Sequence, residues 1–394
     1  MKILLIIPVI LILVLLYLVL PEVDKSGLRP DGGSRLKNKL AELMIRKGAS
    51  DHRSISDYSQ VDVRIPPSTS QTGVDYNDSF VFQGFNAEQG VGYLTRLGFR
   101  DDGELTEVWF WLDVKGKIYY NREQFFDNSP ADKSGLSKGG VTYRVLNEGE
   151  YEITWKGKSE PDNQDIHVQF VFKADSPHYL MSEHRDPRAY GKAMAEMKWS
   201  REYFEKLRAE GADRYERGGV STGTVKIGDG EALNVSLRGF RDRSWGKRNW
   251  LYIKRYIWNL ISLNEDLVIH GKSYNYIIYT TVNYGETFSH LVSGWAGGKD
   301  GIRAISYASD MSQIGEDSIV PKNYETSFRV MDSDEIITLI VNAREGSHSW
   351  FVADGQFEVN ETFAEFEVKG RGIRGEGMQE FGFSHLAYPE RKNQ

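Results

Sequence analysis

The segment from residue 91 to residue 114 reads VGYLTRLGFR (91–100), DDGE (101–104) and LTEVWFWLDV (105–114). Both ten-residue runs are rich in aromatic and aliphatic residues with polar residues between them, a pattern typical of strands. An Asp-Gly pair between two such runs is a frequent signal for a tight hairpin turn. Residues 91–114 are therefore predicted to form a β-hairpin that turns at Asp101-Asp102-Gly103.

The same pattern recurs on both sides of a break near residue 200. Before the break it is found in GKIYYNREQF (116–125), YEITWKG (151–157) and IHVQFVFKA (166–174). After the break it is found in GTVKIG (223–228), LNVSLRGF (233–240), YNYIIYTTVNY (274–284), HLVSGWAGG (290–298), EIITLIVNA (335–343) and TFAEFEVKGRG (362–372). Two sets of short strands with polar turns predict a mainly β chain with two antiparallel barrels or sandwiches.

The break itself has the composition of a helix. Residues 188–211 read RAYGKAMAEMKWSREYFEKLRAEG, in which Ala, Met, Leu, Glu and Lys dominate and Gly211 suits a helix C-terminus. We expect one linking helix at 188–213, between a first β domain at 80–187 and a second at 214–394.

A hydrophobic segment begins the chain. Residues 3–20 contain no charged side chain and span roughly 27 Å as a helix, enough to cross a thin bilayer. A cleaved signal peptide is the alternative, but its apolar region is usually shorter and ends in small residues. Here the run ends at Leu20-Pro21-Glu22, so residues 1–21 are predicted to be an uncleaved transmembrane anchor.

Residues 22–79 are predicted to be a polar linker that contains one short helix. In residues 36–48 the apolar residues have helical spacing, which indicates an amphipathic helix that either rests on lipid headgroups or docks on the β body. The positive-inside rule slightly favours a cytoplasmic body, because more basic residues follow the hydrophobic segment than precede it. The basic residues that follow are Lys25, Arg29, Arg35, Lys37 and Lys39.

Composition excludes several kinds of chemistry. The chain has no cysteine, so disulfides, thiolate catalysis and cysteine-ligated metals are excluded. The net charge of −7 argues against a nucleic-acid partner. The eight histidines form no metal-binding motif, and GRGIRG (370–375) lacks the following helix that a dinucleotide site requires. We expect no metal and no cofactor, and the sequence leaves the oligomeric state open.

Charged and aromatic side chains are densest in RGFRDRSWGKRNW (238–250). In a strand, Arg241, Arg243 and Trp245 would face one way and Asp242 and Ser244 the other. Arginines would keep the Asp242 carboxylate ionised, and tryptophan faces stack on guanidinium groups or flat apolar ligands. The alternative is structural, because Trp–Arg packing closes barrel ends and Arg–Asp pairs fix turns. The predicted ligand-binding residues are Arg241, Arg243, Ser244, Trp245, Arg248 and Trp250.

A family resemblance is carried by RYERGG (214–219), GTV (223–225) and GFRDRSWG (239–246), and more loosely by residues 84–98 and 370–382. These segments resemble uncharacterised proteins with an RDxSWG motif, which are distantly similar to AttH-like proteins and carotenoid 1,2-hydratases. The resemblance implies two lipocalin-like, calycin-type β-barrels in tandem, and cofactor-free hydration, cyclisation or cycloaddition of isoprenoids or polyketides. Where carotenoid hydratases carry a histidine before Asp-x-Trp-Gly, this chain has Arg241 and one additional residue.

Two functions remain open. The first is a membrane-tethered enzyme that hydrates, isomerises or cyclises an isoprenoid, sterol or polyketide with one protonated acid in an apolar pocket. The second is a non-catalytic carrier of such a lipophilic molecule. The candidate catalytic residues are Asp242, Glu376, Glu380 and Glu88, with Asp242 better suited to orient than to protonate. A solvated face is the alternative role for the glutamates.

Overall fold

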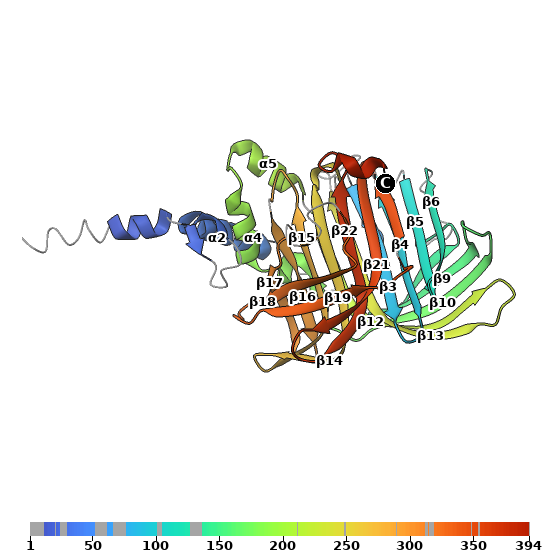
Figure 1. Ribbon diagram of the computed structural model, residues 1–394. Helices are drawn as coiled ribbons and strands as arrows, with labels where there is room; N and C mark the ends of the chain where they lie inside the picture. The colour runs from blue at the N-terminus through green and yellow to red at the C-terminus, as the bar shows by residue number, and fades with distance from the viewer. Residues whose placement is uncertain are drawn as a thin grey trace, which may run out of the picture.

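Two antiparallel sheets make up most of this computed structural model (Figure 1). The structure describes residues 12–19, 21–23, 30–51, 61–65, 76–100, 105–126, 136–210, 212–247, 250–288, 290–311, 314, 319–347, 349–353 and 355–393. The mainly β class predicted from the sequence is confirmed.

The first sheet has the strand order β6-β5-β4-β3-β13-β12-β10-β9-β8-β7, and β11 pairs with β12. The predicted hairpin is present because β4 and β5 pair from Val91↔Val114 to Arg100↔Leu105, although its turn lies outside the described residues. The strands are β3 (Tyr76–Asn86), β4 (Val91–Arg100), β5 (Leu105–Val114), β6 (Lys117–Phe125), β7 (Ser137–Lys138), β8 (Val141–Asn147), β9 (Glu150–Lys158), β10 (Asp165–Ala174), β11 (Tyr179–Leu180), β12 (Asp213–Ile227) and β13 (Leu233–Lys247).

The second sheet closes into a ring. The order β19-β18-β17-β16-β15-β14-β22-β21-β20 is joined by an additional β19–β21 pairing, so eight strands form a cycle and β20 stays outside it. The lipocalin-like tandem remains a prediction, because the edge strands β6 and β7 do not pair with each other in the described part of the first sheet. The strands are β14 (Arg255–Ile269), β15 (Lys272–Asn283), β16 (Leu291–Gly298), β17 (Gly301–Ala308), β18 (Asn323–Val330), β19 (Ile337–Ala343), β20 (Ser349–Ala353), β21 (Phe357–Val368) and β22 (Arg374–Ser384).

The change of sheet differs from the boundary expected at residues 213 and 214. Strands β12 and β13 pair with β10 and β3, so they extend the first sheet instead of beginning the second. The chain crosses to the second sheet between Lys247 and Arg255, through the short 3-10 helix η3 (Trp250–Tyr252). A second 3-10 helix, η5 (Pro389–Asn393), follows the last strand.

The expected linking helix is two helices, and they do not link the sheets. After β11 come α3 (Met181–His184), α4 (Pro187–Glu196) and α5 (Arg201–Glu210), an excursion between β10 and β12, which are neighbours in the first sheet. Extended backbone at Met197 ends α4, and the Ser200 hydroxyl accepts a hydrogen bond from the Tyr203 amide at the start of α5 (3.0 Å). This side-chain cap breaks the segment in two.

The predicted amphipathic helix is confirmed as α2 (Arg35–Asp51), preceded by the paired short strands β1 (Pro21–Val23) and β2 (Pro30–Ser34). It docks on the body, because Ala41 and Ile45 are buried and α2 lies against α4 (Figure 1). The contact is close: a Cβ atom on Gly191 would lie 2.8 Å from the Glu42 amide nitrogen.

The predicted anchor falls mostly outside the described residues. Residues 12–19 are helical, whereas residues 1–11 and 20 are not described. Within the described residues, no helix combines the length and the apolar character needed to span a membrane.

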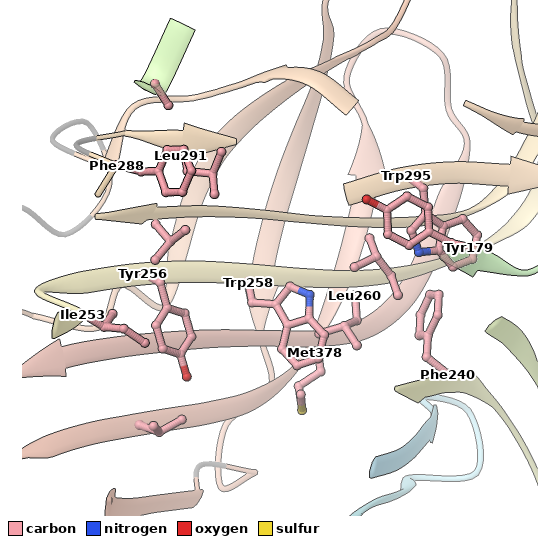
Figure 2. Packing of buried hydrophobic residues seen from close by; sticks show 14 of the residues in the cluster. Tyr179, Phe240, Ile253, Tyr256, Trp258, Leu260, Phe288, Leu291, Trp295 and Met378 are labelled. Atoms are coloured by element: carbon pink, nitrogen blue, oxygen red, sulfur yellow. The ribbon is translucent and has the colours of Figure 1, made fainter. Parts of the chain in front are cut away.

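Hydrophobic side chains are buried in three main places. One cluster is formed mainly by side chains of the first sheet, and another is formed by side chains of the second sheet. The third lies between the sheets and combines side chains from both, including Phe240, Trp258, Trp295 and Met378 (Figure 2). We call this third region the seam.

Candidate functional site

Side chains of β13 alternate between two environments, as the sequence predicted. Phe240 belongs to the cluster at the seam, and Asp242 forms an ion pair there. Arg241 and Arg243 are fully buried on the opposite face, where they meet residues 61–65. One face of the RDxSWG segment therefore contacts residues 61–65, and the other face is directed toward the second sheet.

Arg241 is enclosed by acidic and aromatic partners. Its guanidinium forms an ion pair with Asp62 and lies 4.8 Å and 4.9 Å from the ring centres of Tyr151 and Tyr215. The Tyr151 hydroxyl also donates to the Asp62 carboxylate (2.9 Å). These contacts hold residue 62 against side chains of β9, β12 and β13.

The Arg243 side chain holds the same segment by hydrogen bonds to the backbone of that segment. It donates to the carbonyl oxygens of Val61 (2.8 Å) and Val63 (3.0 Å), and forms an ion pair with Asp78 at 2.5 Å. Burial raises the pKa of Asp78, and the nearby Arg243 guanidinium opposes that rise. We call this set of contacts from Arg241 and Arg243 to residues 61–63 the arginine clamp.

The other predicted ligand-binding residues have separate surroundings. Ser244 shares a hydrogen bond with Ser79 (2.9 Å), and the Trp245 ring centre lies 5.4 Å from the Arg243 guanidinium. Trp250 is buried at the seam, 5.2 Å from the ring of Phe357. Arg248 lies outside the described residues. The ligand-binding role of this group stays a prediction.

Three charged side chains meet on the seam face of β12 and β13. Arg214 lies 3.4 Å from Glu216 (Nη1 to Oε1) and 3.6 Å from Asp242 (Nε to Oδ1). Glu216 and Asp242 are partners in the β12–β13 register, which brings their carboxyl groups together. The second sheet completes the contacts, because Trp295 on β16 donates its indole N–H to Glu216 Oε2 (2.6 Å).

These surroundings favour the protonated form of Glu216. Burial raises the pKa of Glu216 to about 7; Arg214 and the Trp295 hydrogen bond oppose the rise, whereas Asp242 adds to it. Burial alone would lower the pKa of Arg214, but Asp242 and Glu216 reverse this effect and raise it. Near neutral pH, Glu216 therefore keeps its proton in part of the molecules, beside the charged Arg214 guanidinium.

Aromatic rings surround the three charges. The Trp258 ring centre lies 4.9 Å from the Arg214 guanidinium, and Tyr179 and Phe240 lie beside Trp295 (Figure 2). The buried Trp258 Nε1 has no hydrogen-bond partner in the described part of the chain. An unpaired buried donor is one feature of a site that receives a polar atom of a ligand.

The structure separates the four predicted acids into two places. Asp242 and Glu380 both interact with Arg214, because each of the two carboxylates raises the pKa of the Arg214 guanidinium. Glu380 also accepts a hydrogen bond from the Tyr256 hydroxyl. Glu376 instead accepts from the Ala87 amide (2.7 Å), in the same turn as the exposed Glu88. Burial raises the pKa of Glu376, opposed by that hydrogen bond. Glu376 and Glu88 thus lie where β22 meets the β3–β4 turn, not with Asp242.

Sequence reasoning missed Arg214 and Glu216 as site residues, although both stand in the RYERGG segment. The signal that could have identified them is their separation by two positions in a strand, which places both charged side chains on one face. The sequence does not indicate which face meets the second sheet.

A narrow pocket between the sheets has room for about one water molecule. Its lining comes from both sheets and comprises Leu94, Trp111, Asp113, Ile118, Ser347, Glu361, Thr362, Phe363 and Met378. None of these lining residues is Arg214, Glu216 or Asp242.

The fold and the seam define a class: a two-sheet antiparallel β protein with an acid–arginine cluster between its sheets. The model of the family described as "Domain of unknown function (DUF7064)" matches residues 62–383, and the chain belongs to that family. No curated protein sequence is significantly similar to this chain.

Two solved structures share the fold. A candidate AttH protein from Nitrosomonas europaea is 12% identical, with a TM-score of 0.51 over 80% of this chain and 94% of the other. Kievitone hydratase from Nectria haematococca is 13% identical, with a TM-score of 0.50 over 82% and 94%. The distant similarity to AttH-like and hydratase-type proteins is therefore confirmed at the level of fold.

Proposed function

We propose that this chain is a cofactor-independent enzyme that protonates an unsaturated, lipophilic small molecule at the seam, leading to hydration, isomerisation or cyclisation. The observation that carries the proposal is the fully buried Glu216 carboxyl group, held between Arg214, Asp242 and the Trp295 indole within an aromatic wall. A neutral carboxylic acid in an apolar site is the group that protonation of an alkene requires.

In this mechanism Glu216 gives its proton to one carbon of a double bond, and the adjacent carbon becomes cationic. The faces of Trp258 and Trp295 stabilise that cation. Water attack followed by return of a proton to Glu216 gives hydration. Loss of a neighbouring proton to Glu216 gives isomerisation. Attack by a second double bond closes a ring and moves the cation to another carbon, which then loses a proton to Glu216 to give the neutral product. Arg214 and Asp242 orient Glu216, and the Asp242 charge favours the protonated form of Glu216.

The shared fold with kievitone hydratase supports a hydratase-type reaction as the first one to test. The aromatic lining of the seam supports a lipophilic substrate, such as an isoprenoid, sterol or polyketide. We also propose that residues 3–20 tether the body to a membrane, on its cytoplasmic side, which gives access to substrates dissolved in the bilayer.

The test is incubation of the full-length protein with a cellular lipid extract, followed by mass spectrometry of bound and altered species. We expect the wild type to convert an extracted molecule, and Glu216→Gln to bind that molecule without converting it. Glu88→Gln is the matched control, because this exposed glutamate lies away from Arg214.

The outcomes separate enzyme from carrier. A molecule that the wild type binds and releases unchanged, with the same result for Glu216→Gln and Asp242→Asn, identifies a carrier and rejects catalysis. Failure to enrich any lipophilic molecule rejects both functions.

A further inference from the structure

Helix α2 has two different faces. Its inner face, with Ala41 and Ile45, is buried against the body. Its outer face exposes Leu36, Leu40, Leu43 and Met44, each between 44% and 61% exposed. The spacing of three or four residues puts these four side chains in one stripe along the helix.

Basic side chains accompany the exposed stripe. Residues 35–48 contain five basic residues and one acidic residue, in a chain whose overall net charge is −7. The acidic residue, Glu42, is paired with Lys39 and Arg46 at 2.8 Å, which keeps both cations beside the stripe. A helix with an apolar stripe and flanking cations is the type that lies in the headgroup region of an anionic membrane.

A second exposed apolar segment lies next to α2. The helical residues 12–19 are exposed except for Leu18, which is partly buried, and Arg35 at the start of α2 joins the two segments. Its guanidinium lies 4.2 Å from the Tyr17 ring centre and donates to the Tyr17 carbonyl oxygen (3.1 Å). The two apolar surfaces therefore lie at the same end of the molecule (Figure 1).

We propose that the outer face of α2 is a membrane-contact surface that binds anionic lipid and sets the orientation of the β body. The occupant is a bilayer, because the stripe combines positive charge with a neighbouring apolar segment that precedes it in the chain. This inference adds a second membrane contact to the proposed tether, on which the choice of a bilayer partly rests, and it does not depend on the proposed catalysis.

The contact has a structural route to the seam. Helix α2 lies against α4, and Tyr190 of α4 shares a hydrogen bond with Ser293 of β16 (2.8 Å). Strand β16 also carries Trp295, the hydrogen-bond donor to Glu216. When the protein docks on a membrane through α2, the side of the seam at α4 and β16 is therefore the side nearest to the lipid.

The absence of cysteine from the chain allows a direct test with single labels. Full-length Met44→Cys and Val145→Cys proteins are labelled with a polarity-sensitive fluorophore and mixed with phosphatidylcholine vesicles containing about 30% phosphatidylglycerol. Val145 is the matched control, since it is an exposed apolar residue on β8, and the neighbouring β9 lies at the opposite end of the molecule (Figure 1).

We expect bromine-labelled acyl chains to quench about half of the emission at position 44 and less than about a tenth at position 145. Leu40→Glu with Leu43→Glu should abolish quenching at position 44 and leave unfolding unchanged, because both leucines are exposed. Equal quenching at positions 44 and 145, or quenching that survives the two glutamates, would overturn the proposal. So would failure of the full chain to float with the vesicles. Each result is separate from turnover measured in detergent, which tests the catalytic proposal.

Discussion

At the scale of single residues, Glu216 and Asp62 show how differently two buried carboxyl groups behave. Asp62 is paired with Arg241 and fixes a loop to the end of a sheet. Glu216 shares Arg214 with Asp242, so the cluster has more carboxyl groups than guanidinium groups. Burial, helped by the nearby Asp242 charge, raises the pKa of Glu216 toward neutral pH.

Glu216 should make stability depend on pH. Its pKa of about 7 in the folded chain lies above its ordinary value of 4.5, so its stabilising contribution is complete below pH 4.5 and is lost as the pH rises through 7. Denaturant titrations at pH 5 and pH 8 should show that the wild type loses up to about 3 kcal/mol relative to Glu216→Gln. Parallel pH profiles for the two proteins would contradict the assignment.

The arginine clamp should contribute strongly to stability. Asp62→Ala leaves the buried Arg241 guanidinium without its acidic partner and should lower the free energy of unfolding by about 3–5 kcal/mol, measured with urea. Lys369→Ala removes one partner of an ion pair that is about half exposed, and should produce no measurable loss. A tolerated Asp62→Ala would show that the clamp is not needed for folding.

At the scale of elements, glycines allow strands of the two sheets to approach closely. A Cβ atom on Gly218 of β12 would lie 2.3 Å from the ring of Tyr276 on β15. The same ring also contacts Phe240 of β13 at 5.5 Å between ring centres. The aromatic wall of the seam therefore requires glycine at position 218.

Gly218→Ala should push Tyr276 out of place and destabilise the protein by about 1–3 kcal/mol, measured by thermal unfolding. Gly48→Ala in α2 is the control, because nothing lies within 4 Å of the added methyl group and alanine favours the helix. If both substitutions raise the melting temperature, the close packing at Gly218 is not present in solution.

At the scale of the whole molecule, the two sheets share a hydrophobic core at the seam. Phe85 of β3 stacks on Phe363 of β21 with ring centres 4.9 Å apart and an interplanar angle of 10°. The two sheets are also joined by the hydrogen bond from Arg238 to the Leu263 carbonyl oxygen (2.9 Å). Neither sheet buries these groups alone, so we expect the sheets to unfold together.

Phe363→Ala should lower stability by about 3–5 kcal/mol and keep a single transition in which hydrogen exchange rises together in β4 and β22. Phe126→Ala, which truncates a ring that is 79% exposed, should leave the transition unchanged. Two separate transitions, one for each sheet, would show that the seam does not couple them.

The sequence by itself determined the β class, most strand positions and the alternation of Arg241, Asp242 and Arg243, because these depend on side-chain periodicity within one strand. It also determined the amphipathic helix at residues 36–48. Only the tertiary structure decided that β12 and β13 belong to the first sheet, that the helices at 187–210 are an excursion from it, and that Glu216, Asp242 and Trp295 meet. Those contacts join residues up to 79 positions apart across two sheets, and no local pattern specifies which strand faces which.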